Sequence, residues 1–196
     1  MKKFILPVIS ASLFVIIQSA EAQQFTMVKR GIAKSRIIIP EKATVIEIQA
    51  AKVLQDYIQR ISGASIPIEP DNTKRQEGEI LIGNVNRPEL KEVPKEKLDN
   101  DGLFIKSNGS NLIITGGTDK GILYGVYTFL EKYMSCRKYS SAVTIVPKKK
   151  TIVLNAINDM ELPAFGYRET FYRDAVDPEY HVWHKLDSHV GPDKSE

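Results

Sequence analysis

Short apolar segments that end at proline, glycine or asparagine predict β-strands along much of the chain. Two of them, RIIIP at residues 36–40 and EILIG at residues 79–83, are almost continuously apolar. A third, ASIPIEP at residues 64–70, alternates apolar and polar side chains, and its prolines favour a place at the edge of a sheet. The pattern returns late in the chain, with VTIVP at residues 143–147 and TIVLN at residues 151–155. Together these segments predict a β-sheet.

Two longer stretches change to helical spacing. The first begins at Thr44 and ends at Gly63, and its apolar positions are Ala50, Leu54, Tyr57, Ile58 and Ile61. The second follows a glycine-rich turn, and its apolar stripe comprises Leu123, Val126, Tyr127, Leu130, Tyr133 and Met134. Gly125 inside this second helix lowers helix stability by about 1 kcal/mol relative to alanine. We therefore expect Gly125 to face a closely packed sheet.

A β-hairpin is predicted between the two helices. Residues 102–106 (GLFIK) and 111–115 (NLIIT) are apolar, and the Asn108-Gly109 pair between them is a strong hairpin signal. The same residues form an Asn-x-Ser glycosylation sequon, but glycine adopts positive φ easily and favours the turn. Residues 84–100 are rich in proline and charge and predict an exposed connection. Because strands and helices alternate irregularly, the sequence predicts an α+β fold with one mixed sheet and two helices on one face.

The glycine-rich turn, LIITGGTDKG at residues 112–121, runs from a strand into a helix as phosphate-binding loops do. Two of its glycines have the Walker spacing, but the lysine and the hydroxyl residue that should follow are absent. Two adjacent glycines also break the dinucleotide-binding pattern. The sequence therefore predicts a tight turn with Thr118 or Asp119 as the helix N-cap, and no cofactor is expected.

The first 22 residues have the parts of a secretory signal peptide. Lys2 and Lys3 supply the positive start. Residues 4–17 form the apolar stretch, and residues 20–22 have the small-x-small cleavage pattern. The apolar stretch is shorter than the roughly 20 residues that span a bilayer, and no later segment approaches that length. We therefore expect cleavage after Ala22, export to the periplasm or the extracellular space, and no membrane span.

Charge and cysteine content exclude several kinds of partner and site. Loss of two lysines and one glutamate with the signal lowers the net charge from +3 to +2. The only basic run, residues 148–150, predicts a solvated turn, so no nucleic-acid partner is expected. Cys136 is the only cysteine, which excludes an internal disulfide and a cysteine-based metal site. Its position after a helix favours a buried apolar role.

The composition changes near Asn158. This divides the mature chain into residues 23–158, the predicted α+β domain, and residues 159–196, which hold six large aromatic residues. The second part is too short for a core of its own, so it either packs back on the first or opens another domain. A metal site is an alternative for the three histidines of this part, but the usual zinc-helix spacing is absent and no metal is predicted. These histidines are His181, His184 and His189.

Two stretches resemble parts of known glycoside hydrolases. GGTDKGILYGVYTFLEKYMSCRKY, residues 116–139, is similar to the strand, turn and helix of a small α+β domain. That domain precedes the catalytic barrel in family 20 β-hexosaminidases, family 67 α-glucuronidases and related exported bacterial glycosidases. ELPAFGYRETFYRDAVDPEYHVWHKLDSH, residues 161–189, is similar to the beginning of that barrel. The resemblance implies an accessory domain followed, in residues 159–196, by the first strand of an incomplete (β/α) barrel.

The resemblance also implies one sugar-binding residue. In the hexosaminidases a Pro-x-Phe-x-x-Arg-Gly stretch forms the first barrel strand, and Pro163, Phe165 and Arg168 match it. Arg168 thereby takes the place of the arginine that binds sugar hydroxyls. This role suits a rigid fork of donors at the end of a barrel strand. An ion pair with Glu169, Asp174 or another neighbour is the alternative for Arg168.

Two further positions match the family and two depart from it. Lys185 and Leu186 fit a Lys-Leu-Asn stretch that opens the next unit of the barrel. Glu169 replaces the glycine after the arginine, and Asp187 replaces the asparagine. These departures favour the uncharacterised relatives of families 20 and 67 over the hexosaminidases.

Glycoside hydrolysis generally requires two carboxylates held across the scissile bond. The resemblance places them on later barrel strands, so no catalytic residue is predicted here and this chain alone is expected to be inactive. We expect the non-catalytic N-terminal domain of a secreted glycoside hydrolase acting on polysaccharide or glycan. The alternative is a free-standing exported module for carbohydrate binding or scaffolding. An exposed apolar patch would favour the first, and a closed polar surface with residues 161–184 folded onto the sheet would favour the second.

Overall fold

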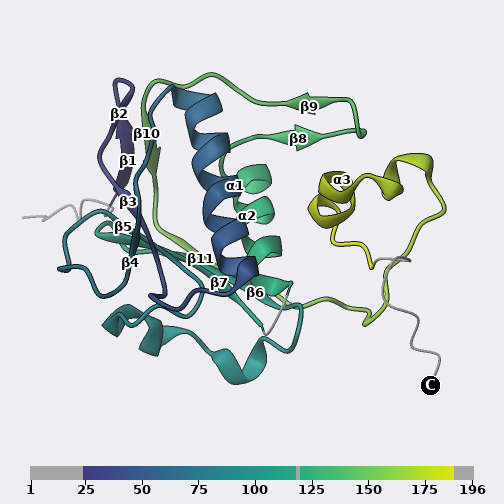
Figure 1. The fold of residues 1–196 in the computed structure, drawn as a ribbon, viewed down its shortest axis with the longest axis horizontal. Helices are drawn as coiled ribbons and strands as arrows, with labels where there is room; N and C mark the ends of the chain where they lie inside the picture. Colours follow the sequence, from purple (N-terminus) through teal and green to yellow (C-terminus); the bar gives the residue numbers. More distant parts are fainter. Residues whose placement is uncertain (1–23, 118–119, 188–196) are drawn as a thin grey trace, which may run out of the picture.

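A six-stranded mixed sheet forms the centre of the molecule (Figure 1). The computed structural model describes residues 24–117 and 120–187, and the predicted signal peptide lies outside them. The four strands from β4 to β7 in the sheet order pair in parallel, whereas β6 and β11 pair antiparallel to their neighbours. In sheet order the strands are β11 (Ile157–Glu161), β6 (Leu103–Ser107), β7 (Asn111–Gly116), β5 (Glu79–Ile82), β3 (Arg36–Ile39) and β4 (Ile68–Pro70).

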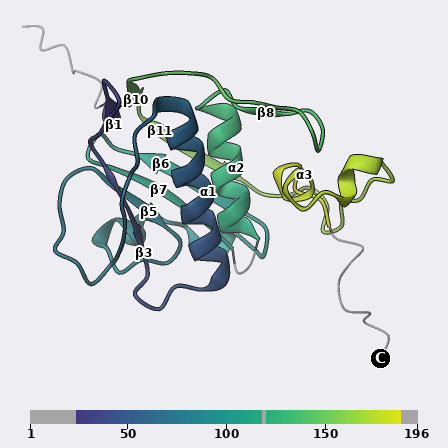
Figure 2. The same cartoon turned by 45° about the horizontal axis from the view of Figure 1, so that its top comes forward.

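The two main helices, α1 (Val45–Ser62) and α2 (Gly121–Lys132), lie side by side on one face of the sheet, as predicted (Figures 1 and 2). A capping box begins α1, because the Thr44 hydroxyl accepts from the Glu47 amide while the Glu47 carboxylate accepts from the Thr44 amide. Gly63 ends the helix with a φ of 81°, a left-handed conformation that glycine adopts without strain. The sequence limits of α1 are therefore confirmed.

Close packing surrounds α2. All residues from Gly121 to Leu130 are buried, so the buried surface is wider than the predicted stripe. A Cβ atom on Gly125 would lie 3.0 Å from a side-chain carbon of β7, which confirms the expected approach of helix and sheet. Lys120 occupies the N-cap position, but its side chain makes no capping hydrogen bond to the helix. The predicted caps Thr118 and Asp119 lie outside the described residues.

The opposite face of the sheet is covered by the connection between β5 and β6 (Figure 1). It contains two 3-10 helices, η1 (Pro88–Glu92) and η2 (Lys95–Lys97). The prediction that residues 84–100 are exposed is wrong in part, because central parallel strands need cover on both faces. The apolar residues of this connection pack against the second face of the strands in a cluster of Ile38, Leu81, Val85, Leu90, Val93, Leu98, Phe104 and Ile113.

Two smaller sheets flank the main one. Strands β1 (Phe25–Lys29), β2 (Ile32–Ala33) and β10 (Ile152–Leu154) form the first, and the sequence analysis missed β1 and β2. Strands β8 (Arg137–Lys138) and β9 (Thr144–Ile145) form a hairpin that extends past the helices toward the last helix, α3 (Figure 1).

The lysine run at residues 148–150 is exposed, as predicted, but it lies in the connection between β9 and β10 and forms no turn. It also satisfies carbonyl groups at the end of α1. The Lys148 ammonium donates to the Arg60 carbonyl at 2.7 Å, and the Lys149 amide donates to the Ile61 carbonyl at 2.9 Å. The run therefore caps the C-terminus of α1, where positive charge is favourable.

The described residues after β11, up to residue 187, contain no barrel strand. Residues 162–172 have no regular structure and are followed by η3 (Arg173–Val176) and the short helix α3 (Pro178–Trp183). No barrel is evident in the described ranges, so the predicted first strand at 163–168 is not found there. The reason is that a strand requires a paired neighbour, whereas the Arg168 backbone bonds to Asp187 instead.

Candidate functional site

Backbone atoms of the loop before β6 pack closely against Gly117 and Gly121 of the glycine-rich turn. The Gly117 amide, which in a phosphate loop would point at the anion, donates to the Gly102 carbonyl at 2.8 Å. A Cβ atom on Gly117 would lie 1.6 Å from the Asp99 carbonyl oxygen, and one on Gly121 would lie 2.3 Å from the Gly102 carbonyl oxygen. The glycines therefore allow strand, turn and helix to contact the loop before β6.

Arg168, the predicted sugar-binding residue, lies beside the N-terminal end of α2. Its guanidinium forms an ion pair with Asp101 and donates from Nε to the Lys185 carbonyl at 2.7 Å. It also donates to the Phe165 carbonyl at 3.1 Å and lies over the ring of Tyr124, 5.7 Å from the centroid. The predicted alternative, an ion pair, is therefore present, with Asp101 as the partner.

The hollow beside Arg168 is small. Its volume is about 50 Å³, and it is lined in part by Asp101, Tyr124, Glu161 and Lys185. Pockets for small ligands typically measure about 300–1,000 Å³. Burial lowers the pKa of Arg168, but the hydrogen bond and charge of Asp101 outweigh it and raise the pKa above its ordinary value. In this arrangement Arg168 joins the segment after β11 to the loop before β6. Sugar binding by Arg168 stays a prediction.

Lys185 and Asp187, which align with the family stretch, extend this link. The Lys185 ammonium lies 2.7 Å from the Glu161 carboxylate, and the Lys120 ammonium lies 3.0 Å from Asp187. Burial raises the pKa of Asp187, but hydrogen bonds from Lys120 and the Arg168 amide hold it below its usual range. The segment after β11 is therefore bonded through charged groups to the base of α2.

A second attachment places α3 on the helix layer. Trp183, only 2% exposed, packs between Tyr57 of α1 and Tyr127 of α2, with ring centroids 5.6 and 5.0 Å away. The Glu179 carboxylate accepts from the Tyr57 hydroxyl and from the buried Lys138 ammonium, both at 2.8 Å. Burial and the adjacent Glu179 raise the pKa of Tyr57 well above its ordinary value, so its hydroxyl remains a donor.

The described histidines, His181 and His184, are not part of a group that could hold a metal ion. His184 Nε2 is 3.0 Å from the Lys138 carbonyl oxygen, and its ring packs on Tyr180 at 4.2 Å. His181 borders an apolar cavity of about 680 Å³, and His189 lies outside the described residues. Within residues 24–117 and 120–187, no group of three His, Cys, Asp or Glu side chains is placed to hold a metal. Cys136 is buried, and burial raises the pKa of its thiol to about 11.

An apolar cavity of about 680 Å³ lies within the last described segment, residues 169–187. Phe171, Tyr172, Val176 and Val182 contribute to its lining together with a few polar residues. The same segment exposes large apolar side chains, with Phe171 94% exposed and Val176 85% exposed. The exposed apolar patch that the sequence analysis set as a test is therefore present, although residues 173–187 also fold back onto the helices.

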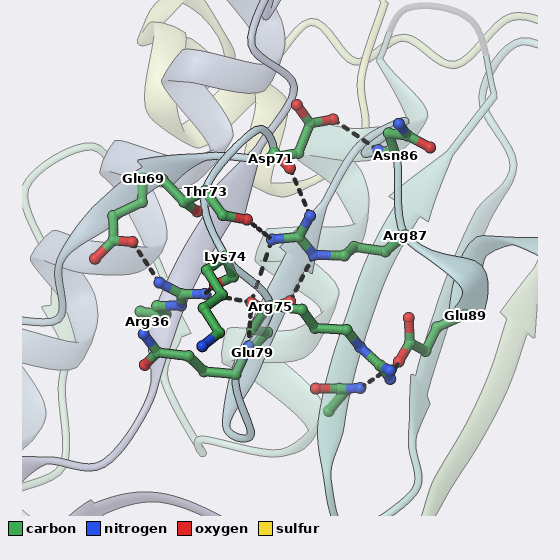
Figure 3. Close-up of polar contacts among 12 residues, drawn as sticks. Arg36, Glu69, Asp71, Thr73, Lys74, Arg75, Glu79, Asn86, Arg87 and Glu89 are labelled. Carbon is green, nitrogen blue, oxygen red and sulfur yellow. Dashed lines mark hydrogen bonds and ion pairs between the residues drawn. The ribbon is translucent and has the colours of Figure 1, made fainter.

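A buried charge cluster, missed by the sequence analysis, lies at the start of the parallel strands (Figure 3). Arg36, Glu79 and Asn111 pair in register across β3, β5 and β7. Glu79, 1% exposed, accepts from Arg36 at 2.6 Å and from Arg87 at 2.8 Å. Glu89 contacts Arg75 and accepts from Asn111. A polar residue at the start of each apolar strand is the signal that could have indicated this row.

Comparisons with known proteins agree with this fold. Residues 20–129 match the family described as glycosyl hydrolase family 67 N-terminus, and no curated protein matches the chain. The family GH115 4-O-methyl-α-glucuronidase BtGH115A, specific for decorated arabinogalactans, superposes with a TM-score of 0.52 at 16% identity, over 74% of this chain and 19% of its own. This likeness shows the fold.

Two other solved structures superpose less closely. A Streptomyces plicatus β-hexosaminidase has a TM-score of 0.48 at 13% identity, over 76% of this chain and 25% of its own. A Vibrio harveyi GH20 exo β-N-acetylglucosaminidase has a TM-score of 0.43 at 19% identity, over 74% and 18%. The aligned part of this chain therefore spans only 18–25% of the length of these three enzymes.

Proposed function

Because this chain belongs to the N-terminal domain family of glycosyl hydrolase family 67, we propose that it is the non-catalytic N-terminal accessory domain of a secreted glycoside hydrolase. The proposed substrate of the whole enzyme is a polysaccharide or glycan. The observation that carries the proposal is the family match over residues 20–129, which include α1, α2 and most strands of the central sheet. The N-terminal signal pattern supports secretion.

The carboxylates of the last segment support a non-catalytic role. Glu161 lies between Lys132 and Lys185, and Glu179 between Tyr57 and Lys138. Burial raises the pKa of Glu161, but the two lysines outweigh it and hold the pKa below its usual value. A glycosidase acid must instead be protonated near neutral pH. These groups therefore serve as partners for nearby cations.

The exposed apolar residues favour an accessory domain over a free-standing module. Phe171 and Val176 are each more than two-thirds exposed, and both line the same apolar cavity. Contiguous exposed apolar surface commonly marks a site that another protein surface covers.

In the described part of the chain, none of the helices has the length and hydropathy of a bilayer crossing.

Hydrolysis assays test the proposal. We expect the purified mature chain, residues 23–196, to release no aryl alcohol from aryl α-glucuronides or aryl N-acetyl-β-hexosaminides above a blank. The native gene product, captured with an antibody against residues 25–157, should hydrolyse at least one aryl glycoside. Turnover by the isolated chain would contradict the non-catalytic role. An inactive native product of the chain's own size would favour the carbohydrate-binding or scaffolding module.

A further inference from the structure

Three segments that are far apart in the sequence meet at the end of the molecule that carries β2 (Figure 1). They are the β1–β2 turn at residues 29–31, the end of α1 at residues 60–63 and the connection before β10 at residues 148–151. The Gly31 amide donates to the Lys150 carbonyl at 2.6 Å, and the Lys149 amide donates to the Ile61 carbonyl at 2.9 Å. Backbone hydrogen bonds therefore fix these segments against one another.

All the charged residues of these three segments are basic and exposed. They form what we call the basic patch, which comprises Lys29, Arg30, Arg60, Lys148, Lys149 and Lys150. Among the described residues, Arg60 alone of the six forms an ion pair, with the exposed Asp56 at 3.5 Å. The net charge of the whole sequence is only +3, so the excess of positive charge is local. Such a surface attracts anionic ligands.

A hollow of about 420 Å³ lies within the basic patch, between residues 59–63 and residues 148–150. Pockets for small ligands typically measure about 300–1,000 Å³. A Cβ atom on Gly63 would lie 3.3 Å from the Lys150 ammonium nitrogen, and one on Gly31 would lie 3.7 Å from the Lys150 side chain. The two glycines therefore leave room for the Lys150 ammonium at the edge of the hollow. A charged group that enters the hollow meets several cations at once.

Arg30 stands at a position that disfavours arginine. Arg30 and Gly31 form the two-residue turn between β1 and β2, and their φ angles are 53° and 77°. A turn with positive φ at both positions favours asparagine, aspartate or glycine. Arg30 therefore makes the turn less stable than asparagine would, and what it adds is a positive charge beside Lys150. This observation points to binding as the role of Arg30.

We propose that the basic patch binds an acidic polysaccharide, a glycan chain that carries carboxylate or sulfate groups. The choice of a glycan rests on the proposed function, whereas the preference for anions rests on the charges of the patch. Figure 1 shows the patch at the opposite end of the molecule from α3, so this site is distinct from the predicted sugar contact of Arg168.

Two other polyanions fit the patch less well. The three segments contain no aromatic residue on which the bases of a single-stranded nucleic acid could stack. An anionic bilayer attracts basic surfaces through a flat array of headgroups. The hollow instead accommodates a charged group that projects from a flexible chain. A glycan with anionic groups along its length fits both the hollow and the cations around it.

Three forms of one glycan provide matched probes for the test, namely neutral dextran, carboxymethyl dextran and dextran sulfate. Fluorescence anisotropy of short labelled chains measures their binding to the mature chain, residues 23–196. At about 0.1 M salt, exposed charges more than about 10 Å apart are largely screened, so clustered charges dominate binding. Carboxymethyl dextran or dextran sulfate should bind at least about tenfold more tightly than neutral dextran. The two anionic probes distinguish carboxylate from sulfate recognition.

Paired lysine variants separate the patch from the net charge. Lys149→Gln with Lys150→Gln removes two ammonium groups beside the hollow, and Lys95→Gln with Lys97→Gln removes two exposed ones from η2. Lys148 is kept because its ammonium caps α1. The first pair should weaken binding of the anionic dextrans by about tenfold and make it less sensitive to salt, because fewer counterions are displaced. The second pair should weaken binding by less than about threefold.

Arg30→Asn repeats the test in a variant that the turn favours. It should weaken binding, while the melting temperature stays the same or rises. Equal losses in the two lysine pairs, or tighter binding to DNA or to phosphatidylglycerol vesicles than to the anionic dextrans, would overturn this inference and leave the proposed function standing. Binding through the patch by an inactive native product of this chain's own size would support the inference and contradict the proposed enzyme.

Discussion

At the residue scale, Glu79 shows how buried charge stabilises this fold. Burial raises its pKa, but hydrogen bonds from Arg87 and Arg36 outweigh burial and hold the pKa below its ordinary value. The pairs therefore stabilise the folded state fully above the unfolded pKa of about 4.3, and this contribution is lost as the pH falls through the lower folded pKa. Figure 3 shows both guanidinium groups directed at this one carboxylate.

The first prediction concerns Glu79→Gln. The substitution leaves two arginines without their buried countercharge, so the free energy of unfolding at pH 7 should fall by about 3–5 kcal/mol. The control is Glu69→Gln, because Glu69 also pairs with Arg36 but is one-third exposed, and it should cost less than about 1 kcal/mol. Urea unfolding at pH 7 and pH 3 measures both. The effect of Glu79→Gln should shrink at pH 3, and a constant effect would contradict the assigned ionisation.

A second prediction concerns the glycine-rich turn. Gly121→Ala puts a Cβ atom 2.3 Å from the Gly102 carbonyl oxygen, so backbone must shift and the free energy of unfolding should fall by about 1–3 kcal/mol or more. Gly166→Ala is the matched control, since no atom lies within 4 Å of its new Cβ, and it should change stability little. Thermal unfolding distinguishes them. Equal melting temperatures would mean that the turn does not pack against residues 98–102.

At the element scale, the sequence predicted the helix ends and the turn that neighbouring residues determine. The start of α1 at Thr44, its end at Gly63 and the Asn108-Gly109 turn were each correctly predicted, because capping and turn formation involve neighbouring residues. The short strands β1 and β2 were missed, because their stability comes from pairing with β10, far away in sequence. The barrel strand was predicted from resemblance, and the described chain offers it no pairing partner.

The candidate site was less predictable for the same reason. Arg168 was singled out, but its partner Asp101 is 67 positions away, and no sequence spacing reveals that contact. The row formed by Arg36, Glu79 and Asn111 depends on the register of three parallel strands, which their long connections set. Sequence reasoning therefore singled out charged residues of the last segment but could not assign their partners.

The third prediction concerns α3. Glu179→Gln leaves the Lys138 ammonium, which is 2% exposed, without its closest carboxylate, so α3 should separate from the helices more often. Trp183 is the only tryptophan of the chain and reports this directly. Acrylamide should quench it more strongly in Glu179→Gln. Tyr57→Phe is the control, because it keeps the ring beside Trp183 and should leave quenching near the wild-type value. Unchanged quenching in Glu179→Gln would show that the ion pair does not hold α3.

At the scale of the whole molecule, the central sheet extends past residue 158, where the composition changes. β11 crosses residue 158, and the segment after it is bonded to α2, to β8 and to the loop before β6. What the segment leaves exposed is apolar, as a surface that contacts a further domain would be. The fold and the exposed surface thus support the proposal that this chain is one domain of a larger secreted glycoside hydrolase.

The mass of the native gene product tests that claim most directly. Exported proteins are separated by size and probed with an antibody against residues 25–157, which cover the central sheet and both main helices. We expect a band several times heavier than the 22.0 kDa of this chain, because the solved enzyme BtGH115A, whose N-terminal part shares this fold, is about four times as long. A single band at the size of this chain would contradict it.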